Sequence, residues 1–149
     1  SGFDVTPALF SELLKIDGIE YIKDSTGDFI RIQELLKTGG KIFNGGDPIT
    51  YQALVAGCVG CVWGSVNFLP EEAVSLYRMV QKGDLAGGAA LWQKLVDSQL
   101  FVWSHVYNAA VKAAANRRGF DVGSCRPPVL PLSAEESEEL FAALDKVLP

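Results

Sequence analysis

One lysine has a residue type and a position suited to covalent chemistry. Lys23 ends a short apolar segment, residues 19–23, whose composition predicts a β-strand. A lysine that is desolvated at the mouth of a strand barrel becomes a neutral amine, which can attack a carbonyl carbon and form a Schiff base. The ordinary alternative is a lysine at a strand end that extends into water. Position alone leaves both interpretations open.

The cysteines and the single histidine offer a second kind of chemistry, metal binding or redox exchange. Cys58 and Cys61 form a CxxC pattern, but zinc needs four ligands, and only Cys125 and His105 remain to complete the set. A redox CxxC normally precedes a helix, whereas this pair enters a predicted strand. We therefore expect small, buried side chains at these positions, with neither a metal nor a cofactor.

Two further motifs are too incomplete to define a site. The run Gly45-Gly46-Asp47-Pro48 ends a predicted strand, and Asp47 followed by Pro48 predicts the cap and first residue of a helix. The amides of this run could receive an anion, but no G-x-G-x-x-G or P-loop pattern indicates a nucleotide. Ser65 lacks the G-x-S-x-G surroundings of a nucleophile elbow.

Repeated strand–helix units position these residues. The predicted strands end near Lys23, Asn44 and Trp63, and each is followed by a helical pattern. Such a repeat predicts parallel strands covered by helices, an α/β fold. Three parallel strands leave two open edges, and eight would close a (β/α)₈ barrel of about 250 residues. We interpret the chain as the later part of such a barrel, or as an open α/β sheet whose edges are covered in another way.

The rest of the chain predicts helices alone. Thr6 before Pro7 marks the start of the first helix, and a capping box at Ser133 marks the start of the last. Between the repeats and the end of the chain, residues 85–100 and 102–118 are rich in Ala and Leu. We therefore divide the chain into βα units at residues 1–84 and a helical extension at residues 85–149.

Composition excludes several classes of partner. The net charge is −5 and the isoelectric point is about 4.8, which disfavours nucleic acids and anionic membranes. The longest apolar stretch, residues 59–69, is shorter than the roughly 20 residues that a membrane span needs. Three cysteines without a secreted spacing pattern, and no targeting pattern at the start, indicate a reducing compartment, and we expect the cytoplasm.

Ordered motifs along the chain resemble one family. The run Tyr21-Ile22-Lys23-Asp24-Ser25-Thr26-Gly27-Asp28 is similar to the signature of the dihydrodipicolinate synthase and N-acetylneuraminate lyase superfamily. The resemblance continues in the right order through Phe43-Asn44-Gly45-Gly46-Asp47, Asn67-Phe68-Leu69-Pro70 and Arg126-Pro127-Pro128. It implies a (β/α)₈ TIM barrel with extra C-terminal helices, of which this chain supplies strands six to eight and those helices.

The resemblance also implies roles for individual residues. Lys23 matches the lysine that forms a Schiff base with pyruvate or another 2-keto acid, without a metal or cofactor. Gly45 and Val62 match positions that line the pyruvate pocket. Ser25 matches a position that contacts the sugar-like part of the substrate in related lyases and aldolases.

Two other positions bear on which substrate is used. Asp47 matches a position that binds polyol hydroxyls in sialic acid lyases, but Pro48 stands where those lyases carry an acidic residue, which argues against sialic acid. Ser65 lies beside a further substrate-facing position. With Ser25 and Asp47 as partners for hydroxyl groups, we expect an aldolase, lyase or dehydratase acting on 2-keto-3-deoxy sugar acids.

Alternatives remain open at this point. One is dihydrodipicolinate synthesis by pyruvate condensation. Another is a non-catalytic half-barrel that self-associates or needs its N-terminal half, because the family's proton-shuttling tyrosine and its carboxylate-binding Thr-Thr-Gly-Glu-like segment have no match here. The resemblance further implies a homo-oligomer, either a dimer or a tetramer.

Overall fold

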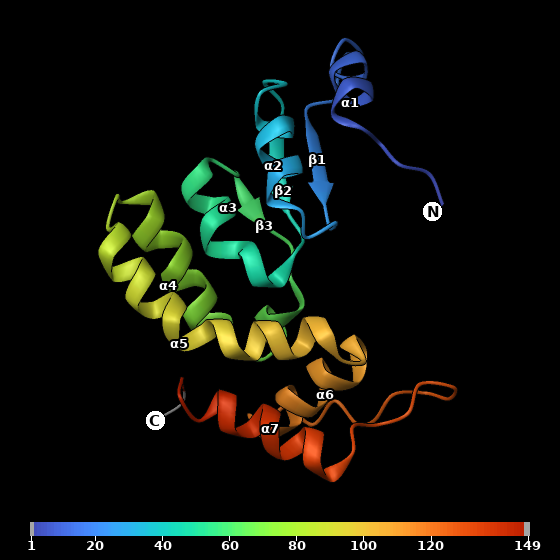
Figure 1. Cartoon of the computed structure of the whole chain (residues 1–149), viewed down its shortest axis with the longest axis vertical. Helices are drawn as coiled ribbons and strands as arrows, with labels where there is room; N and C mark the ends of the chain where they lie inside the picture. The colour runs from blue at the N-terminus through green and yellow to red at the C-terminus, as the bar shows by residue number, and fades with distance from the viewer. Residues whose placement is uncertain (1, 148–149) are drawn as a thin grey trace. The chain divides into compact units, whose positions relative to one another are not determined.

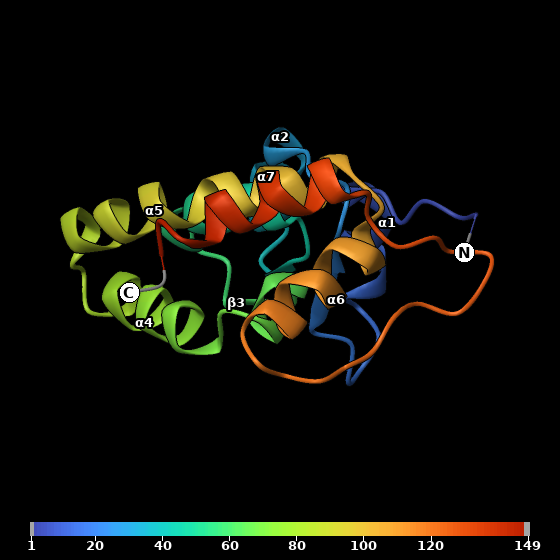
Figure 2. The same ribbon diagram turned by 90° about the horizontal axis from the view of Figure 1, so that it is seen from below.

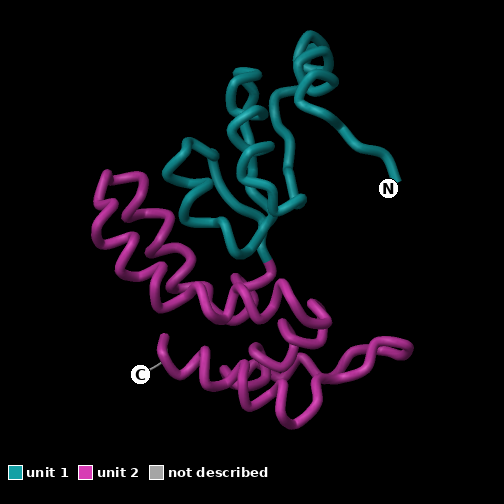
Figure 3. Tube along the Cα trace, viewed as in Figure 1, with its two compact units in different colours: residues 1–63 teal, residues 64–149 magenta. Residues whose placement is uncertain are grey.

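The computed structural model describes residues 2–147, which divide into two compact units between Trp63 and Gly64 (Figure 3). The sequence alone suggested a change of organisation after Asp84. The contacts place the division earlier because helix α4 (Pro70–Gln81) packs along helix α5 (Leu85–Ser104). The helix that follows the third strand therefore belongs to the second unit.

A parallel sheet forms the middle of the first unit. Strands β1 (Tyr21–Asp24), β2 (Lys41–Asn44) and β3 (Gly60–Cys61) lie in that order, with Lys23 opposite Phe43 in the register. Helices α1 (Pro7–Leu13), α2 (Phe29–Leu36) and α3 (Thr50–Ala56) alternate with them (Figure 1). The predicted repeat of strands and helices is thus confirmed. The third strand ends at Cys61, two residues before the predicted end near Trp63.

Local sequence explains where these helices begin and end. The Thr6 hydroxyl accepts from the Leu9 amide at 3.2 Å, and the Asp28 carboxylate accepts from the Ile30 amide at 2.8 Å. Both side chains satisfy amides that the first helical turn leaves without intrahelical partners. Helix α3 ends at Gly57, whose φ of 113° lies in the left-handed region that glycine adopts without strain.

The helices cover one face of the sheet. Ile42 from β2 packs with side chains of the three helices and of the loop after α3, and each member is at most 1% exposed. The other members are Phe10, Ile32, Leu35, Ala53 and Cys58. Because side chains alternate along a strand, the neighbouring positions Tyr21, Lys23, Lys41 and Phe43 belong to the opposite face. Burying the apolar face fixes the register and so fixes which residues face outward.

In the described part of the second unit, residues 64–147, every regular element is a helix. A short 3₁₀ turn, η2 (Gly64–Asn67), precedes α4 and α5, and α6 (Tyr107–Arg117) and α7 (Ala134–Leu144) follow. Helix α7 packs against both α5 and α6 (Figure 2). The predicted capping box is present at Ser133 and Glu136. The two Ala- and Leu-rich segments, residues 85–100 and 102–118, do form helices, but α5 continues through Phe101 to Ser104 because no glycine or proline interrupts the chain there.

Candidate functional site

The outward face of the sheet carries Lys23 beside two aromatic rings. The rings of Tyr21 and Phe43 stack with centroids 5.9 Å apart, and the Lys41 ammonium lies 4.7 Å from the Tyr21 centroid. Lys41 also donates to Glu20, and this hydrogen bond raises the pKa of the lysine. Lys23 itself is exposed. The expected low-dielectric walls do not flank it within residues 2–147, because three strands leave this face of the sheet open.

The structure brings Lys23, Ser25 and Gly45 together at the carboxyl ends of the strands. A Cβ placed on Gly45 would lie 2.5 Å from Lys23 Cε and 2.3 Å from Ser25 Oγ, closer than real atoms approach. The Gly45 amide donates to the Asp24 carbonyl at 2.7 Å, which ties the end of β2 to the end of β1. Glycine at this position therefore leaves the space that the lysine side chain occupies.

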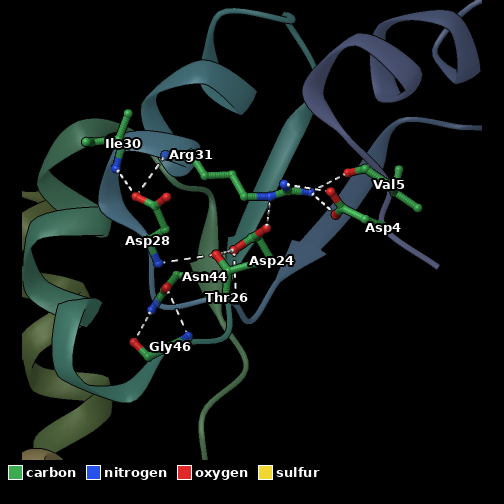
Figure 4. A network of polar contacts seen from close by, with 9 residues as sticks. All are labelled: Asp4, Val5, Asp24, Thr26, Asp28, Ile30, Arg31, Asn44 and Gly46. Carbon is green, nitrogen blue, oxygen red and sulfur yellow. Dashed lines mark hydrogen bonds and ion pairs between the residues drawn. The ribbon is translucent and has the colours of Figure 1, made fainter. Parts of the chain in front are cut away.

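A buried carboxylate fixes the loop that follows Lys23 (Figure 4). Asp24 Oδ1 accepts from the Thr26 amide at 3.0 Å and from the Thr26 hydroxyl at 2.5 Å. The Thr26 hydroxyl oxygen then accepts from the Asp28 amide at 3.2 Å, next to the start of α2. Hydrogen bonds thus link Asp24, Thr26 and Asp28 in turn, and Ser25 lies between the first two of these residues, next to the lysine in the chain.

Arg31 on α2 compensates the charge of Asp24. Its Nε donates to Asp24 Oδ2 at 2.7 Å, and the side chains of the pair are 17% and 5% exposed. The other end of the guanidinium donates to Asp4 Oδ1 and to the Val5 carbonyl, both at 2.6 Å. The hydrogen bond with Asp4, followed by the one with Asp24, raises the pKa of the arginine against the effect of burial. Figure 4 shows the guanidinium between the N-terminal segment and the end of β1.

A second loop, after β2, is held by Asn44. Its side-chain amide donates to the Gly46 carbonyl at 2.9 Å, and its oxygen accepts from the Gly46 amide at 3.1 Å. The same amide group reaches Thr50 Oγ1 at 3.2 Å. A Cβ on Gly46 would lie 3.0 Å from Gly27 Cα, so the loops after β1 and β2 are in contact. The two loops that carry the candidate residues therefore lie against each other at one edge of the sheet.

The remaining predicted substrate residues occupy different environments. Asp47 is completely buried, and the turn η1 (Asp47–Ile49) is capped by Gly46, so the prediction that Asp47 caps a helix is wrong. Val62 is half-exposed, and its amide donates to the Asn44 carbonyl at 2.8 Å. Ser65 is buried within η2 of the second unit, where its carbonyl accepts from the Leu69 amide at 2.8 Å. Their contacts with substrate stay predictions.

The CxxC cysteines are free thiols, of which Cys58 is buried and Cys61 is partly exposed. Burial raises the pKa of Cys58 to about 11 and that of Cys61 to about 12. A thiol is nucleophilic and redox-active as its thiolate, so neither cysteine is activated at neutral pH. Within residues 2–147, no group of three or more His, Cys, Asp or Glu side chains is arranged to hold a metal ion.

The roles of Asp24, Arg31 and Asn44 at this edge were not predicted from the sequence. Asp24 and Asn44 both lie inside the family-like motifs and both end a strand, and this position could have indicated a role at the edge. Arg31 gives no such signal, because one of its carboxylate partners lies 27 positions away along the chain.

No helix among the described residues combines the length and the apolar character needed to cross a bilayer.

Comparison with known proteins shows the family of this chain. The model of the dihydrodipicolinate synthetase family matches residues 1–147. The 4-hydroxy-tetrahydrodipicolinate synthase of Ligilactobacillus salivarius is 29% identical over 135 residues, which are 89% of this chain and 47% of that protein. The enzyme of the same name from Methanococcoides burtonii is 25% identical over 99% of this chain and 52% of its own length.

Solved structures agree with the sequence relatives. A putative dihydrodipicolinate synthetase from Pseudomonas aeruginosa superposes with a TM-score of 0.89 at 29% identity, over 99% of this chain and 52% of its own. YagE from E. coli K12, described as a member of the dihydrodipicolinic acid synthase family and solved with pyruvate, gives a TM-score of 0.87 at 25% identity over 97% and 51%.

The chain spans about half the length of the relatives that it matches. Its three parallel strands and following helices are the C-terminal part of a (β/α)₈ barrel, strands six to eight with the C-terminal helices. The expected family is confirmed: the chain belongs to the dihydrodipicolinate synthetase family.

Proposed function

We propose that the protein containing this chain is a lyase that activates pyruvate as a Schiff base on Lys23. Three observations support the proposal. Lys23 stands at the carboxyl end of a parallel strand, the edge where barrel enzymes place their catalytic groups. Gly45 leaves room for its side chain, and the Asp24–Arg31 pair fixes the neighbouring loop. The family relationship supplies the reaction class.

The proposed reaction begins at the carbonyl carbon of pyruvate. The uncharged Lys23 Nζ adds to C2, the hydroxyl group of the resulting carbinolamine takes up a proton, and loss of water then leaves a protonated imine. The positive nitrogen withdraws electrons, so a proton can leave the C3 methyl group and the electron pair enters an enamine. The enamine carbon then adds to the carbonyl carbon of an aldehyde, and hydrolysis of the imine returns free Lys23.

The aldehyde condensation is a better proposal than cleavage of sugar acids. The two sequence relatives reported above carry the name 4-hydroxy-tetrahydrodipicolinate synthase, and neither is named for a sugar acid. Asp47, which the sugar-acid interpretation uses as a hydroxyl partner, has no exposed surface. Dihydrodipicolinate-type condensation, the alternative in the sequence analysis, therefore becomes the leading proposal, and 2-keto-3-deoxy sugar acids become the competing substrate.

Assembly and location stay predictions from the family and the composition. We expect a homo-oligomer, a dimer or a tetramer, in the cytoplasm. Sedimentation of the protein containing this chain tests the first expectation: a single monomeric species would contradict it.

An activity assay with a matched lysine control tests the proposal. Pyruvate-dependent loss of an aldehyde substrate should disappear in Lys23→Arg and persist in Lys41→Arg, because Lys41 shares the sheet face but pairs with Glu20. A parallel assay should find no pyruvate release from a 2-keto-3-deoxy sugar acid. Full turnover by Lys23→Arg would contradict the imine role, and pyruvate release from the sugar acid would restore the competing substrate.

A further inference from the structure

The second unit contains a cavity that the proposed reaction does not use. It has a volume of about 540 Å³ and lies between helix α6 and the extended segment at residues 120–129. Its walls combine cationic and amide groups with aliphatic ones. The residues that matter here are Asn108, Val111, Lys112, Val122, Arg126 and Val129.

Hydrogen bonds to α6 hold the outer wall of this cavity in place. Lys112 Nζ donates to the carbonyls of Val122 and Ser124, both at 2.9 Å. One turn further on, Asn116 donates to the Gly123 carbonyl at 3.1 Å and accepts from the Val122 amide at 2.9 Å. Four hydrogen bonds therefore hold the extended segment that forms this wall of the cavity against helix α6.

The charge balance of the cavity is positive. Its lining contains Lys112 and Arg126 and no carboxylate. Other cations of this unit do have acidic partners, as in the pairs Arg117–Asp145 and Lys146–Asp97. By contrast, the Lys112 ammonium donates to two neutral carbonyls. Among the ion pairs of residues 2–147, none involves Arg126. A negative group entering the cavity would meet two cations whose charges are not neutralised.

The aliphatic part of the lining limits which anion fits. Val111 is half-buried on α6, and Val122 and Val129 belong to the opposite segment. Apolar walls of this kind stabilise a ligand with an apolar body, whereas a fully hydrated inorganic ion would gain nothing from them. An arginine presents a planar fork of donors that matches the two oxygens of a carboxylate.

The geometry points to a binding site for a small organic carboxylate with an apolar body. The carboxylate group lies between Lys112 and Arg126, with the Asn108 amide as a third polar partner, and the body lies on the valines. This site involves residues of the second unit alone. It is independent of Lys23, and failure of the imine proposal would leave it untouched.

Calorimetric titration of the protein containing this chain tests the site with three probes. Benzoate carries both features, benzamide keeps the ring without the charge, and inorganic phosphate keeps charge without the apolar body. We expect benzoate to bind more tightly than either. Arg126→Gln should weaken benzoate binding at least about tenfold, because charge-assisted hydrogen bonds are the stronger class.

Two control variants make the outcome decisive. Arg78→Gln removes an exposed arginine on α4, outside the cavity lining, and should leave benzoate affinity unchanged. Lys23→Arg should also leave it unchanged, which separates this site from the proposed reaction. Equal binding of benzamide and benzoate, equal binding of phosphate, or no effect of Arg126→Gln would each overturn the proposal.

Discussion

Arg31→Gln should destabilise the first unit by removing the cation that compensates a buried carboxylate. The arginine donates to Asp24, Asp4 and the Val5 carbonyl, so its loss affects both the loop after β1 and the N-terminal segment. Glutamine keeps the polarity and much of the side-chain length but carries no charge. Asp24 would then keep only the hydrogen bonds from Thr26.

The expected loss of stability follows from the exposure of each partner. The Asp24 side chain is 5% exposed, and removal of one member of a buried ion pair costs about 3–5 kcal/mol. Arg31 is 17% exposed, so water can reach the vacated space and the cost falls to the lower end, about 3 kcal/mol. The Asp4 carboxylate is 63% exposed, and Asp4→Asn should cost at most about 1 kcal/mol.

Urea unfolding of the protein containing this chain measures both values. Arg31→Gln should lower the unfolding midpoint without changing the slope, since a changed slope would indicate a different folded or unfolded state. Asp24→Asn combined with Arg31→Gln should cost less than the sum of the two single changes, because the double variant leaves no buried unpaired charge. Arg31→Lys keeps the charge but loses the fork and should lie between wild type and Arg31→Gln.

Two results would refute this reasoning. If Arg31→Gln costs no more than Asp4→Asn, the ion pair with Asp24 contributes little, and the loop beside Lys23 is held by something else. Additive costs for Arg31→Gln and Asp24→Asn would likewise mean that the two side chains do not stabilise each other.

Three further changes probe other parts of the molecule. Gly45→Ala should displace Lys23 Nζ and lower the rate of imine formation with pyruvate, since the new Cβ would lie 2.5 Å from the Lys23 Cε atom. The free energy of unfolding should fall as the pH rises above about 9, because the cysteines ionise there in the unfolded state but not in the folded state. The fall should end near pH 11 to 12, where Cys58 and Cys61 ionise in the folded state as well. Ser133→Ala should lower the stability of the second unit by about 1 kcal/mol through loss of its capping hydrogen bond, measured by thermal unfolding.

Matched controls accompany these changes. Gly2→Ala adds a methyl group to open space and should leave imine formation unchanged. Cys58→Ala with Cys61→Ala should flatten the fall in stability above pH 9, and an unchanged slope would contradict the assigned pKa shifts. Ser75→Ala alters an exposed serine within helix α4 and should cost less than Ser133→Ala; equal costs would contradict the capping role.

Features governed by neighbouring residues were predictable from the sequence. The side chains of Thr6, Asp28 and Ser133 accept hydrogen bonds from amides two or three positions further along the chain. Such an interaction involves only nearby residues, so residue types and spacing are enough to predict it. Lys23 and Ser25 were identified from a contiguous motif, and the structure places both beside Gly45.

Features governed by distant contacts were not predictable in this way. The bridge from Arg31 to Asp24 and Asp4 depends on how α2 and the N-terminal segment approach β1. Asp47 shows a related failure: its sequence context suits a helix cap, but the chain buries it and Gly46 takes the capping position. The exposure of Lys23 likewise depends on how many strands surround it, which its own motif does not encode.

Trapping of the pyruvate adduct tests the central claim most directly. The protein containing this chain is incubated with pyruvate, reduced with borohydride, digested and mapped by mass spectrometry. The account predicts a reduced pyruvate adduct on the peptide that contains Lys23, and its absence from Lys23→Arg. An adduct on another lysine, or none on the wild-type protein while it turns over pyruvate, would contradict it.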